Sequence, residues 1–230
     1  MQNMPRLKTW LGLAVLAIGL YLAHRFVPAQ HNPLRPPDLA EPVGLATYGK
    51  LTTLKHDRAL CLENLSAVGV EYIVLPPDGA EARCPLDHSL TLKRSLTPYN
   101  AALLRMTCHQ LAALYVWENR IARPQAERIF GSPLRQIETY GAFNCRNIAG
   151  TGQRSQHSYA NAIDISGFVL EDGRRITVRD DWRARSDAGK YLARVHKGAC
   201  RLFSVTLGPD YNAAHADHFH FDMGSAETCK

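Results

Sequence analysis

The sequence contains no C-x-x-C pair, no G-x-S-x-G turn, no internal repeat and no run of lysine or arginine. Without C-x-x-C pairs a four-thiolate zinc site is not expected, and without G-x-S-x-G a serine hydrolase has little support. Basic residues exceed acidic ones by only 27 to 21, and three of them lie in the first 25 residues. With no basic stripe among aromatic residues, we expect no nucleic-acid partner.

One long apolar run lies near the N-terminus. Residues 10–23, WLGLAVLAIGLYLA, are uncharged and follow two basic residues, which is typical of a signal peptide or a short signal anchor. The run is shorter than the ~20 residues that comfortably span a bilayer. Small residues at 27–29 offer a moderate cleavage site, whereas Arg25 argues against efficient processing. We expect residues 1–27 to be a signal anchor or a cleaved signal peptide; a buried core helix is the other possibility.

All six cysteines lie beyond this segment. An even number of cysteines without metal-binding spacing favours disulfides in an oxidising compartment, although buried free thiols are an alternative. The sequence cannot decide the pairing. Cys61 with Cys84, which would close a short loop, is our expectation for one bond. The cysteines are Cys61, Cys84, Cys108, Cys145, Cys200 and Cys229.

The chain divides into a linker and one domain after the apolar run. Residues 28–47 hold five prolines and no sustained periodicity, so we expect an extended proline-rich linker. Residues 48–230 then form a single domain large enough for a hydrophobic core.

Within this domain, apolar spacing predicts an α+β fold with helices packed on a small, mainly antiparallel sheet. We expect one long amphipathic helix from residue 100 to about 121 and a short helix that Pro124 opens and Gly131 closes. His109 in the long helix is expected to be packed or exposed rather than a ligand. Further elements are expected as short strands within 51–93, strands at 134–140, 162–170 and 175–178 with an Asp-Gly hairpin turn, a helix at 187–200, and strands at 201–207 and 218–223.

Two clusters carry the residue types of a metal site. HADHFH (215–220) contains three histidines, and SQHSYANAID (155–164) contains His157 and Asp164. In an extended strand His218 and His220 point to the same face. Asp164 lies in an apolar run, and a buried carboxylate needs a metal, an arginine or several donors. Imidazole and carboxylate are the usual ligands of catalytic zinc, so we expect Zn²⁺, with a structural salt bridge for Asp164 as the alternative.

The order of these clusters resembles the zinc peptidases that comprise D-Ala-D-Ala carboxypeptidases, D-Ala-D-Ala dipeptidases and penicillin-insensitive murein endopeptidases. Those enzymes show S-x-H-x-x-G-x-A-x-D followed by H-x-H, and Ala160 stands here where they have glycine. A wider stretch, from NCRN (144–147) through both clusters to LGPDYNAAHADHFHFDM, resembles the bacterial extensin-like C-terminal domain family over roughly residues 60–229.

The resemblance implies that His157, Asp164 and His220 hold zinc. It also implies that His218 lies beside the reacting groups, while His215 is at the position of a general base. Either His215 or His218 could accept a proton near neutral pH, and an exposed turn histidine is the alternative for His215.

Three further residues are candidates for substrate binding. Ser155 could position the His157 loop or a substrate group, or serve only as a turn residue. Arg146 and Arg154 could bind a peptide carboxylate through the guanidinium, and a solvated surface position is the alternative for each.

We therefore expect a zinc-dependent peptidase or amidohydrolase that acts on peptidoglycan peptides in the cell envelope, with its domain in the periplasm, either anchored in the inner membrane or secreted. The alternative is a non-catalytic envelope scaffold or binding module. Three protein ligands would favour the enzyme, and a fourth would favour a structural metal.

Overall fold

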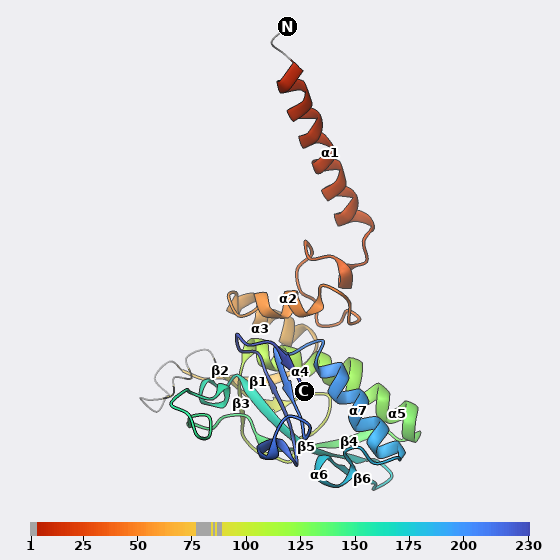
Figure 1. Ribbon diagram of the computed structural model, residues 1–230, viewed down its shortest axis with the longest axis vertical. Coiled ribbons are helices and arrows are strands. Elements are labelled where there is room, and N and C mark those ends of the chain that lie inside the picture. Colours follow the sequence, from red (N-terminus) through yellow and green to blue (C-terminus); the bar gives the residue numbers. More distant parts are fainter. Residues whose placement is uncertain (1–3, 77–83, 85, 87–88) are drawn as a thin grey trace.

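The computed structural model describes residues 4–76, 84, 86 and 89–230, and it shows a single helix that projects from an α+β domain (Figure 1). This helix, α1 (Met4–Phe26), is long and apolar enough by length and composition to cross a membrane over Lys8–Phe26. Its side chains from residue 8 to 22 are exposed, so it does not pack in the core. Part of the region expected to form strands and loops, at 77–83, 85 and 87–88, is outside the described residues.

The proline-rich segment after α1 is in contact with the domain. Leu39 is 1% exposed and belongs to the hydrophobic core. The Arg120 guanidinium donates to the Ala40 carbonyl, and the Lys50 ammonium donates to the Ala29 carbonyl at 2.7 Å. The segment is therefore held at several points along its length, including a short 3-10 turn, η1 (Ala29–His31).

Two helices and a small sheet follow. Helix α2 (Thr47–Thr53) and helix α3 (Arg58–Ala67) precede three antiparallel strands in the order β1-β2-β3. The Asp57 side chain caps α3 by accepting from the Leu60 amide. The strands are β1 (Glu71–Val74), β2 (Ser89–Arg94) and β3 (Leu104–Thr107).

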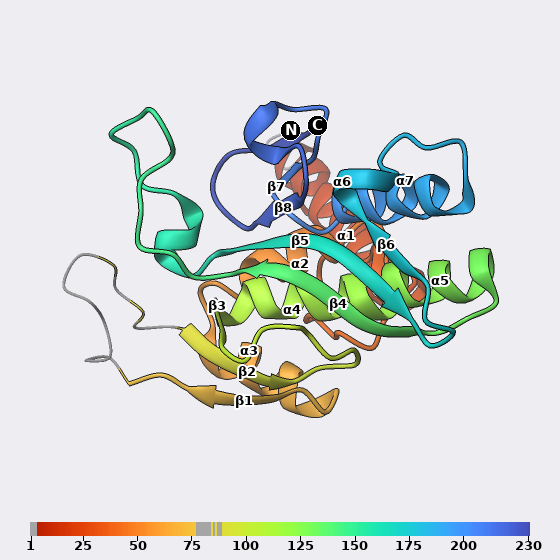
Figure 2. The same ribbon diagram turned by 90° about the horizontal axis from the view of Figure 1, so that it is seen from below.

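The long helix expected from residue 100 is wrong over its first part. Leu104 and Met106 form β3 and pair with Leu92 and Leu90 of β2. Helix α4 (Cys108–Trp117) begins only after Thr107, whose side chain accepts from the Gln110 amide. The helix is also buried on every side rather than amphipathic, because it lies between the two sheets (Figure 2). It continues through a π-helical segment, η2 (Glu118–Ala122), into α5 (Arg123–Phe130), which ends at Gly131 with a left-handed φ of 65°.

The larger sheet has six strands and carries the C-terminal half of the chain. Its main path is β4-β5-β8-β7-β9, with β6 paired to β5, and only β7 and β9 are parallel. The expected hairpin between β5 and β6 is confirmed. The sheet is mainly antiparallel, as expected. The strands are β4 (Leu134–Gly141), β5 (Ala162–Leu170), β6 (Arg175–Thr177), β7 (Val205–Leu207), β8 (Phe219–Asp222) and β9 (Thr228–Cys229).

Helix α7 (Asp187–Ala199) packs against α5, and Trp117 of α4 connects this helical layer to the large sheet. The Trp117 indole donates to the Val195 carbonyl of α7 at 3.0 Å and lies edge-on to Phe221 of β8. The predicted strand at 201–207 is shortened to β7, because a turn follows α7. The remaining elements are α6 (Val178–Asp181), α7 (Asp187–Ala199), η3 (Gln156–Tyr159) and η4 (Ala213–His215).

All six cysteines form disulfides, as the even count predicted, but the expected Cys61–Cys84 bond is wrong. Cys61 of α3 pairs with Cys108 at the start of α4, because these two helices pack together. Cys84 instead pairs with Cys145, in the loop that leads toward η3, and Cys200 pairs with Cys229. Each bond therefore joins segments whose proximity depends on the tertiary fold.

Candidate metal centre

Strand pairing brings the two sequence clusters together. In the antiparallel ladder of β5 and β8, Asp164 lies directly opposite His220. Side chains at directly opposed positions on one face are neighbours. His157 reaches the same point from η3, the 3-10 turn between β4 and β5. Residues more than 50 positions apart in the chain therefore meet on one face of the sheet.

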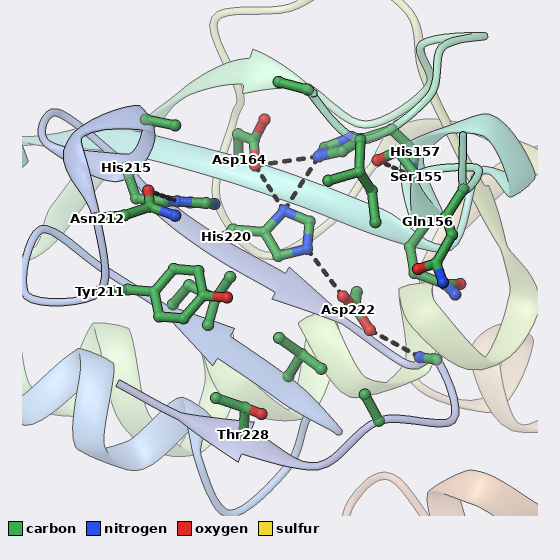
Figure 3. Close-up of a pocket in the computed structure, with 18 of the residues that line it drawn as sticks. Ser155, Gln156, His157, Asp164, Tyr211, Asn212, His215, His220, Asp222 and Thr228 are labelled. Carbon is green, nitrogen blue, oxygen red and sulfur yellow. Dashed lines mark hydrogen bonds and ion pairs between the residues drawn. The ribbon is translucent and has the colours of Figure 1, made fainter. Parts of the chain in front are cut away.

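Three atoms from these residues converge (Figure 3). Asp164 Oδ1 lies 3.1 Å from His157 Nε2 and 3.0 Å from His220 Nδ1, and the two nitrogens are 3.1 Å apart. Ligand atoms of a tetrahedral zinc ion, each about 2.0–2.1 Å from the metal, are about 3.3 Å apart. The triangle thus has nearly the size that a zinc ion requires.

Hydrogen bonds on the far side of each imidazole orient the two histidines. His157 Nδ1 lies 2.7 Å from the Ala142 carbonyl, and His220 Nε2 lies 2.8 Å from Asp222 Oδ2. Because a carbonyl and a carboxylate only accept, these ring nitrogens carry the hydrogens. The opposite nitrogens, His157 Nε2 and His220 Nδ1, face Asp164. A protonated ring donates to this carboxylate, whereas a neutral ring presents a lone pair to the same point. With both rings neutral, the three converging acceptors suit a cation, and outer partners of this kind are usual for histidine ligands.

The charges within the triangle are strongly coupled. Burial opposes ionisation of Asp164, but hydrogen bonds from His157 and His220 outweigh it and hold the pKa of this carboxyl well below its usual range. Burial likewise opposes a charge on His220, yet the adjacent carboxylates of Asp164 and Asp222 raise its pKa to about 9. Both shifts favour an anionic carboxylate facing positive charge in this cluster.

His218 lies at the edge of the triangle and is held by its own partners. Its Nε2 is 3.6 Å from Asp164 Oδ1, and its Nδ1 is 3.0 Å from Asp217 Oδ1. The other Asp217 oxygen accepts from Arg179 at 2.6 Å and from the Tyr140 hydroxyl at 3.2 Å. The Asp217 carboxylate therefore fixes the hydrogen of His218 on Nδ1 and turns the Nε2 lone pair toward the triangle.

His215 also faces this cluster from η4. Its ring centroid is 5.2 Å from that of His218 and 5.9 Å from that of His220, and its Nδ1 is 2.7 Å from Asn212 Oδ1. Burial and the two neighbouring histidines lower the pKa of His215 to about 4. It is therefore a neutral imidazole near pH 7, at the rim of the triangle rather than in a remote turn.

Ser155 acts on the loop that carries His157. Its hydroxyl caps η3 by accepting from the His157 amide at 3.3 Å. Ala160 ends η3 with a left-handed φ of 50°, a conformation that glycine adopts more readily than alanine.

A cavity of about 530 Å³ opens over the triangle. Arg146 and Arg154 line it from the exposed loop between β4 and η3. The Arg154 guanidinium lies 2.9 Å from Cys84 Sγ, whereas Arg146 retains most of its donors for a ligand. Val205, Leu207 and Ala226 form an apolar wall. The cavity therefore combines this apolar wall with the positive charge of Arg146 and Arg154.

The sequence did not identify Tyr140 and Arg179 as partners of this site. Tyr140 lies at the end of β4 and Arg179 in α6, far along the chain from Asp217. Their role as partners of Asp217 becomes visible only in the folded structure, where both donate to the same carboxylate oxygen. A second group in the described residues, His196 with Cys200 and Cys229, also has metal-binding spacing, but its two sulfur atoms are joined in a disulfide.

Comparison with known proteins places this chain in a family. Residues 59–230 match the family described as Extensin-like protein C-terminus. A search of curated proteins found no match. Because the family match spans well over half of the chain, this protein belongs to the extensin-like C-terminal domain family.

Proposed function

We propose that this protein is a zinc-dependent peptidase or amidohydrolase that cleaves peptidoglycan stems or cross-links in the cell envelope, in the manner of a DD-peptidase or murein endopeptidase. The observation that carries the proposal is the convergence of Asp164 Oδ1, His157 Nε2 and His220 Nδ1 within 3.1 Å of one another. Three protein ligands beside an open cavity are typical of catalytic rather than structural zinc.

His157, Asp164 and His220 would hold the ion. When bound, zinc would supply Lewis acidity that polarises a carbonyl and activates water. The Ala142 carbonyl and the Asp222 carboxylate support this assignment, because they keep both imidazoles in the tautomer that a ligand needs.

His218 would accept and return a proton. Its Nε2 lone pair faces the triangle, and the Asp217 carboxylate beside Nδ1 would stabilise the imidazolium that forms on protonation. Arg179 and Tyr140 keep Asp217 in place through its second oxygen. His215 is the second candidate for this role, because its Nδ1 is occupied by Asn212 and its other nitrogen is available to accept.

The cavity and the N-terminus support a peptidoglycan substrate at the envelope. Arg146 on the cavity rim would bind a peptide carboxylate, and Arg154 would add positive charge beside it. The three disulfides suit an oxidising compartment. An apolar helix at α1 suits either a membrane anchor or a signal sequence, which supports a periplasmic or secreted domain.

Metal content in four variants tests the site. We expect Asp164→Ala and His220→Ala to lose zinc in elemental analysis, because each removes one of three ligands. His218→Ala should retain zinc and lose most activity on purified muropeptides, and Lys190→Ala on the exposed surface of α7 is the control. Retention of zinc at the wild-type level in both ligand variants would contradict the assignment.

His218 also supports the alternative function. Because its Nε2 is only 3.6 Å from Asp164 Oδ1, a small movement would make it a fourth ligand, and a closed four-ligand site is typical of structural zinc. The protein would then be a non-catalytic envelope scaffold or binding module. Loss of zinc from His218→Ala, together with unchanged muropeptides after long incubation, would favour this alternative.

A further inference from the structure

A second cavity, of about 320 Å³, lies between α2, the start of α4 and the end of β8. It shares only Gly224 with the lining of the candidate metal cavity. No carboxylate is among the described residues that line it, whereas a lysine and two histidines are. The lining residues are Tyr48, Thr52, Thr53, Lys55, His56, His109, Ser204, Met223 and Gly224.

His109 is the buried polar residue of this cavity. It is 7% exposed, and its Nε2 has no hydrogen-bond partner in the described part of the chain. Burial and the positive charge of Lys55 lower the pKa of His109 to about 4, against a smaller opposing effect of Asn161. The imidazole is therefore neutral near pH 7. A buried ring nitrogen without a partner is unfavourable unless a ligand or water satisfies it.

Donors and positive charge lie on the other walls. The Tyr48 hydroxyl and the Ser204 hydroxyl are 3.1 Å apart, so one of their two hydrogens remains free to donate. Lys55 and His56 are exposed, and neither forms an ion pair with any residue that the structure describes. The hydroxyls of Thr52 and Thr53 donate to backbone carbonyls within α2, so their hydrogens are not available to a ligand in the cavity.

We propose that this cavity binds a phosphate group, with Lys55 and the Tyr48–Ser204 pair as donors and His109 Nε2 as a third donor in the tautomer that carries its hydrogen there. Donors on three walls match the several oxygens of a phosphate, and charge-assisted hydrogen bonds from an ammonium group to such oxygens are strong. The absence of carboxylates among the described lining residues removes the group that would repel an anion.

Two sources could supply the phosphate. Helix α2 lies on the side of the domain that faces α1 (Figure 1), so the headgroup of a phospholipid beside an inserted α1 could reach the cavity. A free phosphate or phosphate monoester is the other source. The recognition chemistry is the same for both, and the two differ in whether the phosphate is a diester.

Titration of the full-length chain in an uncharged detergent tests the proposal. One arm uses inorganic phosphate and the other uses glycerophosphoglycerol, the water-soluble headgroup of phosphatidylglycerol, both against chloride at equal ionic strength. Calorimetry gives the Kd for wild type, Lys55→Gln, His109→Gln and the matched control Lys190→Gln on α7. We expect saturable binding of at least one probe that Lys55→Gln and His109→Gln each weaken at least about tenfold, a change well above measurement error.

The two probes separate the sources. Tighter binding of glycerophosphoglycerol supports a lipid headgroup, and tighter binding of inorganic phosphate supports a free phosphate or monoester. If His109→Gln does not fold, Lys55→Gln alone decides. The proposal is overturned if neither probe binds saturably, or if Lys190→Gln weakens binding as much as Lys55→Gln does.

Discussion

Glu118 is a carboxyl group with no solvent exposure, at the start of the π-helical segment that follows α4. Burial raises its pKa to about 7, although hydrogen bonds from the side chains of Tyr99 and Ser95 and from the Thr97 amide act in the opposite direction. The folded state therefore binds the Glu118 proton more tightly than the unfolded state does, where the pKa is near 4.5.

The sign of the pH effect follows from this difference. The stabilisation from proton binding is fully present below the unfolded pKa and is lost as the pH rises through the folded pKa of about 7. A shift from 4.5 to about 7 corresponds to about 3 kcal/mol in total. Of this, about 2 kcal/mol is lost between about pH 5.5 and about pH 8.

Glu118→Gln should remove this loss. A glutamine side chain is neutral at every pH, and its oxygen can accept from Ser95 and Thr97 while its amide donates to the Tyr99 hydroxyl. Relative to wild type, we expect the variant to gain about 2 kcal/mol of unfolding free energy on going from about pH 5.5 to about pH 8, or about 1 M in the urea midpoint. Urea unfolding followed by tryptophan fluorescence measures it.

The control is Glu127→Gln on the exposed surface of α5. This variant should follow the wild-type pH profile, since its carboxyl group is in solvent. Comparison of variants is necessary because buried His109, whose lowered pKa has the opposite effect on stability, also titrates. A constant difference between Glu118→Gln and wild type at both pH values would refute the reasoning.

Three other predictions concern the linker, a disulfide and the candidate metal site. Leu39→Ala should lower the unfolding free energy by about 2–5 kcal/mol in urea titrations, because it empties a core position; a loss below about 0.5 kcal/mol would show that the linker is not docked. Cys61→Ser with Cys108→Ser should cost about 4 kcal/mol, from a bond that joins residues 47 positions apart, and an unchanged urea midpoint would contradict this. Ser155→Ala should weaken zinc binding about fivefold in competition with a chromophoric chelator, because the lost cap is worth about 1 kcal/mol, whereas unaltered affinity would remove Ser155 from the site.

The elements with strong local patterns could be predicted from the sequence. The apolar run of β5, the Asp-Gly turn after it and the helix at 187–199 all match the expected boundaries closely. The start of α4 could not be predicted from the sequence. The preceding residues 104–107, LRMT, alternate over only four positions and are adjacent to a longer apolar stretch. Pairing with β2 decides their conformation, and that contact is not local.

The candidate site, too, could be predicted from the sequence only in part. Residue types and spacing pointed to His157, Asp164 and His220, but Asp164 lies opposite His220 only because two strands pair whose facing residues are 56 positions apart in the chain. The Ala142 carbonyl that orients His157 has no side-chain signature at all. Disulfide pairing depended on how α3 packs on α4, which local spacing does not reveal.

The docking of the segment after α1 limits where this protein can act. Twenty residues of extended chain would reach about 70 Å, enough for a domain to work well away from a membrane that holds α1. With Leu39 in the core and Arg120 bonded to Ala40, that reach is lost. If α1 is inserted, the cavity stays at a nearly constant height above the bilayer. If the protein is the hydrolase proposed above, it would then meet substrate only by lateral diffusion within a thin layer along the membrane, and substrate beyond that layer would have to diffuse to it.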